Sequence, residues 1–294
     1  MLHGWIILDK PVGLGSTQAV GAVKRILKEA GEPKTKVGHG GTLDPLASGV
    51  LPIALGEATK LAGRMLDATK QYEFTIRFGE ETDTLDAQGA VAETSAHRPT
   101  REDVEAVLPR FTGAIEQIPP AFSALKIEGK AAYARSRAGE QVEMVARTVT
   151  VHELRLLASG ADEATLSATV SKGTYIRSLA RDIARALTTV GHVTMLRRTR
   201  AGPFGLETAI SLDFLANAAK ARQLDGAVLP LNAALDDIPA LPVTPGQAQL
   251  LRHGQKLAGF PATPGLQLAT EEGTPVALVE ASADGLRVVR GFNL

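Results

Sequence analysis

The sequence contains one stretch that decides its fold, Gly38-His39-Gly40-Gly41-Thr42-Leu43-Asp44-Pro45-Leu46-Ala47-Ser48-Gly49-Val50-Leu51. Its glycines allow positive φ angles or a close approach of the backbone to a ligand. Pro45 favours an extended or turn conformation at Asp44, so we expect this carboxylate on a loop with a fixed direction. The pattern alone leaves two interpretations open. Asp44 either caps the element that follows a glycine-rich turn, or it points into a cleft as a reactive group.

The composition limits the class of protein. The 294 residues exceed one average domain, which favours a large core with a small appendage. No apolar run reaches the roughly 18 residues of a membrane span, and residues 1–10 lack the pattern of a signal peptide, so we expect a cytoplasmic protein without a membrane segment. The absence of cysteine excludes disulfides, thiolate catalysis and cysteine-bound zinc. The 32 basic and 32 acidic residues balance, which argues against nucleic-acid binding unless basic residues gather on one face.

The N-terminal region predicts a strand, a turn and a helix. Residues 5–8 are apolar, and the helix begins at Ser16 or Thr17, either of which can cap it, and ends at Gly31. The order strand, Gly-x-Gly, helix is also typical of dinucleotide binding. That interpretation fails because Gln18 replaces the third glycine and no acidic residue ends a second strand about 20 residues later.

Residues 70–79 form the clearest strand of the chain. Every second residue carries a large apolar or aromatic side chain, so four of these side chains share one face of the strand: Tyr72, Phe74, Ile76 and Phe78. Tyr72 is therefore either the first residue of a core stripe or a functional residue, because its hydroxyl needs a partner when it is buried.

Two segments flank this strand. Residues 50–55 predict a buried strand, and residues 57–66 predict a helix that turns Leu66 inward. The acidic residues 80–89 lack the carboxylate spacing of a calcium loop, which favours a solvated turn.

Basic and aromatic residues gather in residues 119–147. This proline-led segment, with a predicted helix over residues 131–139, combines positive charges with rings, namely Lys126, Lys130, Arg135, Arg137, Phe122 and Tyr133. Single-stranded RNA requires charges for its phosphates and rings for its bases. A solvated helical hairpin remains the alternative.

Later segments predict strands over residues 149–154 and 166–170, followed by a helix from Ile176. On this helix Arg177 and Arg181 lie four residues apart, which is unfavourable unless anions compensate their charges. Residues 192–199 predict a further strand, and residues 197–200 form the densest basic cluster, a candidate phosphate contact. The last part of the chain, residues 236–294, predicts a short helix after Thr244 and three strands.

Four ordered motifs in this chain resemble those of the TruB family, the tRNA pseudouridine-55 synthases. The glycine-rich stretch is close to GHxGTLDPxAxGVL, and the others are KxYxF at residues 70–74, KGTYIRSLxxD at residues 172–182, and LRRT before Gly-Pro-Phe at residues 196–204. The resemblance covers residues 4–235. Gly40 departs from the signature, because many bacterial members carry Thr there.

The resemblance implies a pseudouridine-synthase fold of the α/β (α+β) class, with a mixed central sheet and a catalytic cleft. Residues 1–235 would form the catalytic domain, with an RNA-gripping insertion at about residues 119–147. Residues 236–294 would form a small β-rich, PUA-like RNA-binding domain. The implied substrate is the T arm of tRNA, modified by a cytoplasmic monomer that needs no cofactor, metal or protein partner.

The resemblance also implies roles for individual residues. Asp44 would drive glycosidic cleavage, Arg177 would pair with it, and Tyr72 would hold the uracil and accept the proton from C5. The flipped nucleotide would be framed by His39, Tyr175 and Leu196. Lys126 and Arg197 would contact the RNA backbone.

Two other classes of function remain open from the residues. A protein that only binds or folds RNA has no reason to place Asp44 where phosphates approach. An N-glycoside hydrolase would use two carboxylates about 5 to 9 Å apart, whereas the sequence offers one at the glycine-rich loop.

Overall fold

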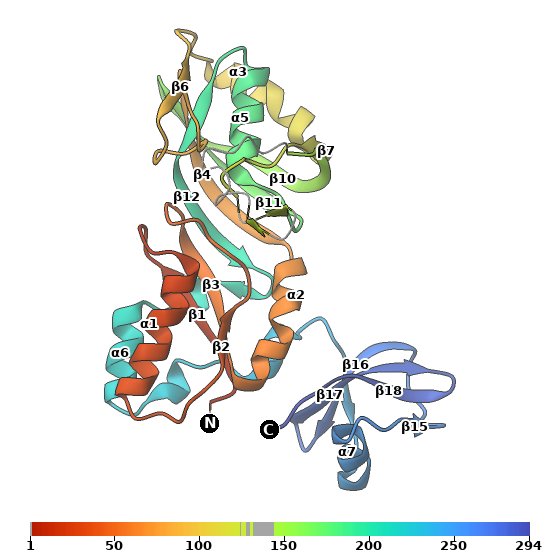
Figure 1. The fold of residues 1–294 in the computed structure, drawn as a ribbon. Helices are drawn as coiled ribbons and strands as arrows, with labels where there is room; N and C mark the ends of the chain where they lie inside the picture. Colours follow the sequence, from red (N-terminus) through yellow and green to blue (C-terminus); the bar gives the residue numbers. More distant parts are fainter. Residues whose placement is uncertain (1, 124, 128–129, 132–143) are drawn as a thin grey trace.

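A computed structural model describes residues 2–123, 125–127, 130–131 and 144–294 of the chain. Its centre is a nine-stranded mixed sheet with the main order β1-β3-β12-β4-β11-β10-β7, while β2 pairs with β3 and β13 with β12. All of these pairs are antiparallel except β3 with β12. The long strands β4 and β12 connect the two halves of the sheet (Figure 1). The expected mixed central sheet is therefore confirmed.

The strands of the central sheet have the following bounds: β1 Gly4–Lys10, β2 Val37–His39, β3 Ser48–Leu55, β4 Lys70–Phe78, β7 Gly113–Gln117, β10 Arg147–Ser159, β11 Glu163–Val170, β12 Gly191–Ala201 and β13 Phe204–Gly205. Two short hairpins stand apart from it, β5 (Glu80–Thr82) with β6 (Val91–Thr94) and β8 (Lys126–Ile127) with β9 (Lys130–Ala131).

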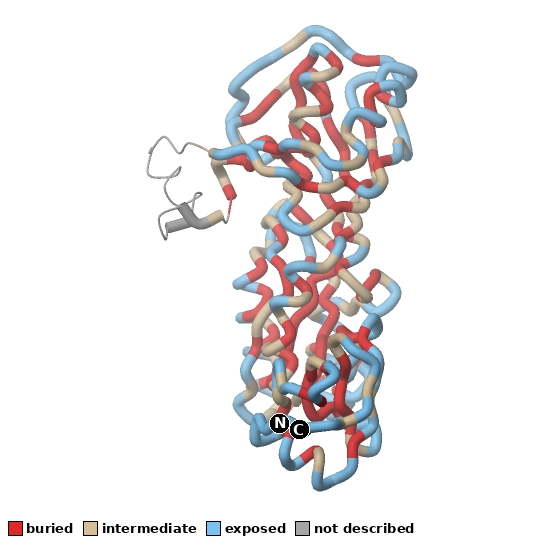
Figure 2. The backbone as a smooth tube through the Cα atoms, turned by 90° about the vertical axis from the view of Figure 1, so that its right-hand side faces the viewer, coloured by how far each residue is buried: buried red, intermediate tan, exposed pale blue. Residues whose placement is uncertain are grey.

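Four helices contribute side chains to one continuous core with the sheet: α1 (Ser16–Glu29), α3 (Arg101–Val107), α5 (Ile176–Ala186) and α6 (Leu212–Lys220). A second cluster includes Trp5 and Ile7 of β1, whereas Ile6 and Leu8 join the first. Because side chains alternate along a strand, β1 is buried on both faces. The buried positions follow the sheet through the middle of the molecule (Figure 2).

A second sheet follows the first in the chain. It has the order β14-β16-β17-β18-β15, with β14 Ala240–Pro242, β15 Leu257–Ala258, β16 Gly265–Glu271, β17 Thr274–Ser282 and β18 Gly285–Gly291. Helix α7 (Pro245–Arg252) packs on it and is capped by Thr244, as the sequence predicted. Leu268, Leu278 and Phe292 from this part belong to the same buried cluster as Trp5, so the two sheets are joined by apolar contacts.

Two predictions about local structure were wrong. Residues 57–66 form a 3-10 turn, Gly56–Leu61, and then the short helix α2, Ala62–Asp67, on which Leu66 is 52% exposed. The cap of α1 is Gly15, whose N–H donates to the Gln18 side chain, and neither Ser16 nor Thr17 caps this helix. The predicted helix over residues 131–139 lies almost entirely outside the described residues, and Ala131 itself is in β9.

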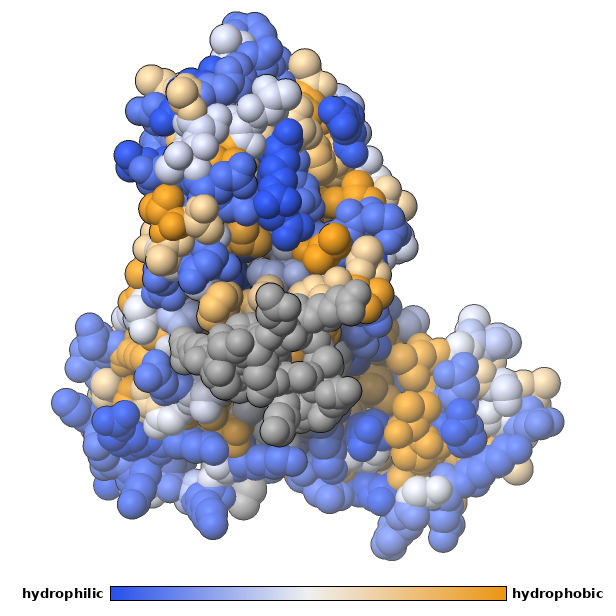
Figure 3. All heavy atoms as spheres, turned by 45° about the horizontal axis from the view of Figure 1, so that its top comes forward, coloured by the Kyte–Doolittle hydropathy of each residue, from blue (hydrophilic) through white to orange (hydrophobic). Residues whose placement is uncertain are grey.

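The visible face in Figure 3 is mostly hydrophilic, with apolar side chains in separate groups. In the described part of the chain, no helix combines the length and apolar character needed to span a membrane.

The parallel pairing of β3 with β12 depends on Gly49. This residue lies opposite Arg198, has a φ of +99°, and would place a Cβ atom 2.2 Å from the Arg198 carbonyl oxygen. A side chain is therefore excluded both by its conformation and by the neighbouring backbone.

We expect Gly49→Ala to lower the free energy of unfolding by at least about 1 to 3 kcal/mol, from backbone strain alone. Gly21→Ala is the matched control, because it lies in α1 with no atom within 4 Å of the added methyl group. Removing a mid-helix glycine should stabilise by about 0.5 to 1 kcal/mol. Urea denaturation of both variants measures the difference, and equal stability of the two would contradict the close approach.

Candidate functional site

A cavity of about 520 Å³ opens beside the glycine-rich loop. Four segments line it, namely residues 41–44, the beginning of β4, residues 170–177 without Lys172, and the middle of β12, together with Leu66 and Leu125. Its size is within the range of about 300 to 1,000 Å³ that is typical of small-ligand sites.

Strand alternation builds the floor of the cavity. Arg198 lies directly opposite Tyr72, and Leu196 lies opposite Phe74. Because residues two apart share a face, Tyr72, Leu196 and Arg198 point to the same side of the sheet. All three line the cavity, and Tyr72 is half-buried while Phe74 is fully buried. In the stripe predicted from the sequence, Phe74, Ile76 and Phe78 therefore belong to the core, and Tyr72 belongs to the cavity wall.

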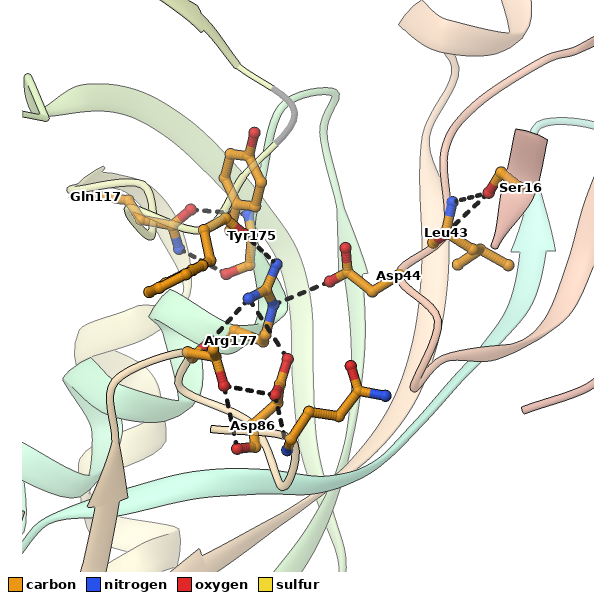
Figure 4. A network of polar contacts seen from close by, with 10 residues as sticks. Ser16, Leu43, Asp44, Asp86, Gln117, Tyr175 and Arg177 are labelled. Atoms are coloured by element: carbon orange, nitrogen blue, oxygen red, sulfur yellow. Dashed lines mark hydrogen bonds and ion pairs between the residues drawn. The ribbon is translucent and has the colours of Figure 1, made fainter. Parts of the chain in front are cut away.

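Asp44 and Arg177 meet across this cavity (Figure 4). The Arg177 Nε atom lies 2.9 Å from the Asp44 Oδ2 atom, and the Nε–H does not point well at an acceptor, so the contact is ionic rather than a directed hydrogen bond. Arg177 is 5% exposed and Asp44 is 35% exposed. The pair therefore joins a buried cation to a carboxylate that a ligand can reach.

Asp86 is a second carboxylate on the same guanidinium. Its Oδ2 atom lies 3.4 Å from Arg177 Nη1, and its Oδ1 atom accepts hydrogen bonds from the Thr84 hydroxyl and the Gln88 N–H. Its side chain is 5% exposed. The interpretation of residues 80–89 as a solvated turn was wrong, because residues 80–82 form β5 and Asp86 is buried.

The loop that carries Asp44 is fixed from two sides. The Ser16 hydroxyl donates to the Leu43 carbonyl at 2.9 Å and accepts from the Leu43 N–H at 2.8 Å. From the other side, the Arg198 guanidinium donates to the carbonyls of Gly41 and Thr42. Ser16 thus holds this loop instead of capping α1.

Buried lysines add positive charge around this loop. Burial and the nearby Arg198 charge lower the pKa of Lys70 to about 8, although its ammonium donates to the Leu66 and Ala68 carbonyls. Burial likewise lowers the pKa of Lys10 to about 8, while the Asp44 charge opposes this shift. Among the described residues that line the cavity, the charged side chains are Asp44, Lys70, Arg177 and Arg198. The cavity therefore carries more positive than negative charge.

Tyr175 is held on both its backbone and its ring. The Gln117 side chain accepts from the Tyr175 N–H at 2.8 Å and donates to the Tyr175 carbonyl at 3.1 Å. The Arg147 guanidinium lies 4.9 Å from the centre of the Tyr175 ring, a cation–π contact. Sequence analysis identified neither Gln117 nor Arg147.

The structure brings together Asp44, Tyr72, Tyr175, Arg177 and Leu196 of the predicted site. His39 ends β2 and is not among the lining residues; burial, followed by the Arg198 charge, lowers its pKa.

Of the two predicted phosphate contacts, Arg197 has a different setting from the one expected, and the prediction for Lys126 stays untested. Arg197 pairs with Asp9 at 2.9 Å, and the adjacent Arg198 is buried, so residues 197–200 do not form an open basic cluster. Lys126 lies in β8, and its side chain is outside the described part.

The departure at Gly40 has a local explanation. A Cβ atom at Gly40 would lie 2.6 Å from the Met65 Cβ atom, so Met65 occupies the space that a side chain would need. Among the described residues, no group of three or more His, Asp or Glu side chains could hold a metal ion.

Comparison with known proteins gives a consistent result along the chain. Residues 24–176 match the family described as "TruB family pseudouridylate synthase (N terminal domain)", and residues 177–236 match "tRNA pseudouridylate synthase B C-terminal domain". The tRNA pseudouridine synthase B of Zymomonas mobilis is 61% identical over 292 residues, which is 99% of this chain and 96% of the relative. The protein of that name from Novosphingobium aromaticivorans is 60% identical over 100% of this chain and 98% of its own.

A solved structure of an H/ACA RNP bound to a substrate RNA containing 2′-deoxyuridine has a chain of the same fold. The two chains superpose with a TM-score of 0.76 at 26% identity, covering 99% of this chain and 86% of the other.

Asp86→Asn tests the second carboxylate. Removing one partner of a fully buried ion pair lowers the free energy of unfolding by about 3 to 5 kcal/mol. For Asp86→Asn we expect a decrease near the lower end of this range, because Asp44 remains to compensate Arg177. Asp44→Asn should cost less, since Asp44 is 35% exposed. Urea denaturation compares the two, and a smaller loss for Asp86→Asn would show that Asp86 is not the buried partner.

Proposed function

The chain belongs to the TruB family of pseudouridylate synthases, and from this we propose that it converts uridine 55 in the T arm of tRNA to pseudouridine. The observation that carries the proposal is the Asp44–Arg177 pair in a cavity that also contains Tyr72 and Leu196. Incubating the protein with a T-arm stem-loop and mapping pseudouridine tests it. A stem-loop with cytidine at the target position is the control.

The proposed reaction is an isomerisation. The target base leaves the stack and enters the cavity. Asp44 drives cleavage of the N1–C1′ bond, and uracil departs with the electron pair of that bond. The base then rotates, C5 bonds to C1′, and the proton on C5 is transferred through Tyr72 while N1 gains a proton. Water is not consumed, and the product has the same atoms as the substrate.

The charges around Asp44 support this chemistry. A departing uracil carries negative charge, and Lys70, Arg177 and Arg198 line the cavity into which it would be released. Fixed positive groups in a site that excludes water stabilise developing negative charge without reorganisation. The same excess of positive charge favours the phosphates of RNA, although the chain as a whole is neutral.

The organisation of the chain belongs to the proposal. Residues 1–235 would form the catalytic domain, and residues 236–294 a small PUA-like RNA-binding domain. The separate sheet from β14 to β18 and the end of the second family match at residue 236 support this division. The gripping insertion at about residues 119–147 lies only in part within the described residues. Action as a monomer in the cytoplasm stays a prediction.

Hydrolysis of an N-glycosidic bond is the alternative that Asp86 raises. Such a reaction would use two carboxylates that both reach the substrate. Asp44 lines the cavity, whereas Asp86 is not among its lining residues and is held by Thr84 and Gln88. The second carboxylate therefore supports Arg177 and does not face the substrate.

Asp44→Asn should abolish isomerisation and leave RNA affinity nearly unchanged, because the amide keeps the shape of the carboxylate but is not a nucleophile. Asp162→Asn is the control, since this exposed carboxylate pairs with Arg98 away from the cavity. Single-turnover assays on the T-arm stem-loop compare the two. Appreciable turnover by Asp44→Asn, with deamidation excluded by mass spectrometry, would disprove the role of Asp44.

Tyr72→Phe should preserve RNA binding and strand packing but slow the reaction. The variant loses only the hydroxyl, and general acid–base groups contribute about 10² to 10⁴ in rate. Comparison of the single-turnover rate with the dissociation constant of the stem-loop separates the two effects. A rate equal to that of the wild type would return Tyr72 to a packing role.

A further inference from the structure

Arg198 contacts the backbone of the loop that carries Asp44, here called the catalytic loop (residues 40–47), and of the strand β3 that follows it, rather than an acidic side chain. Its Nε atom donates to the Val50 carbonyl at 2.7 Å, Nη2 donates to the Gly41 carbonyl at 3.2 Å, and Nη1 lies 3.4 Å from the Thr42 carbonyl. The residue is 1% exposed, and no described acidic side chain pairs with it. Burying a charge is costly unless polar partners compensate it. The three carbonyls therefore fix the position of the guanidinium, and the guanidinium in turn fixes the positions of the carbonyls.

The three carbonyls flank the segment that carries Asp44, with two of them before Asp44 and one after it. Gly41 and Thr42 precede Asp44, and Val50 is in β3, which follows it. Between them, Ser16 fixes both polar backbone atoms of Leu43. A planar guanidinium can hold acceptors in several fixed directions, which a lysine ammonium on a flexible stem cannot reproduce.

We propose that Arg198 is a positioning residue for Asp44, which fixes the backbone of residues 41–43 so that the carboxylate meets the target nucleotide. The inference rests on the proposed function. In this role the guanidinium fork of Arg198 acts on the reaction through the loop and not through contact with the RNA, and the positive charge that Arg198 gives the cavity is a separate contribution that Arg198→Lys keeps.

The competing role is a direct phosphate contact, because Arg198 also lines the cavity. The two roles predict different measurements. A lost phosphate contact weakens RNA binding and lowers the slope of log affinity against log salt by about 1. A displaced carboxylate leaves binding intact and slows the reaction, and a shift of about 1 Å in a reacting group can cost about 10²-fold.

The test compares Arg198→Lys with Arg185→Lys. Arg185 makes a two-pronged ion pair with Glu81 outside the cavity, so its variant loses a similar guanidinium fork without touching the loop. We expect the single-turnover rate of Arg198→Lys at saturating stem-loop to fall by about 10²-fold. Its dissociation constant and salt slope should match those of the wild type, and Arg185→Lys should keep the wild-type rate.

Hydrogen exchange of the Leu43 N–H gives a second measurement that does not depend on activity. It should become faster in Arg198→Lys and stay unchanged in Arg185→Lys. An unchanged rate, an unchanged exchange of Leu43, or weaker binding with a flatter salt slope would overturn the proposal.

The test also covers variants that do not fold and a wild-type protein that shows no activity. If Arg198→Lys does not fold, Arg198→Gln replaces it, since its amide can still donate to one carbonyl. Failure of both to fold would overturn the proposal, because Arg198 would then serve the fold itself. Wild-type protein that forms no pseudouridine in the same assay would instead reject the proposed function.

Discussion

One guanidinium joins the parts of the chain that form the site. Arg177 comes from the start of α5, contacts Asp44 and Asp86, and donates to the carbonyls of Thr84 and Phe122. Its acceptors lie in three segments that are distant in sequence. Because a buried charge is stable only when its partners are in place, the ion pairs of Arg177 fix the relative position of these segments. The Asp44 carboxylate is thus oriented by the same contact that stabilises the cation.

Charge is distributed unevenly in this neutral chain. Acidic and basic residues balance over the whole sequence, yet Lys10, Lys70, Arg177 and Arg198 are all buried close to the loop that carries Asp44. The lowered pKa values of Lys10 and Lys70 are the consequence of bringing these groups together away from water. This arrangement concentrates positive charge around the cavity of a protein that has no basic excess.

The central sheet provides the rigid support for the site. Its single parallel pair, β3 with β12, requires Gly49 against the Arg198 backbone and places the loop that carries Asp44 beside Tyr72 and Leu196. The positions of Tyr72, Leu196 and Arg198 in the cavity wall therefore come from strand register, which cannot shift by one residue without turning the side chains to the other face. Sites built on strands keep their geometry better than sites built only on loops.

The sequence by itself determined the family and several of the local elements. Alternation identified β4, Thr244 marked the start of a helix, and Pro45 correctly indicated that Asp44 lies on a loop. Only the tertiary structure decided that Asp86 is buried against Arg177, that Ser16 holds Leu43, and that Arg198 is enclosed by carbonyls. Local periodicity reports which side of an element is apolar, and it does not encode which distant backbone atom will satisfy a polar side chain. From the sequence alone, an acidic residue in a turn or an arginine on a strand is therefore predicted to be solvent-exposed, and only the tertiary structure shows that it is buried.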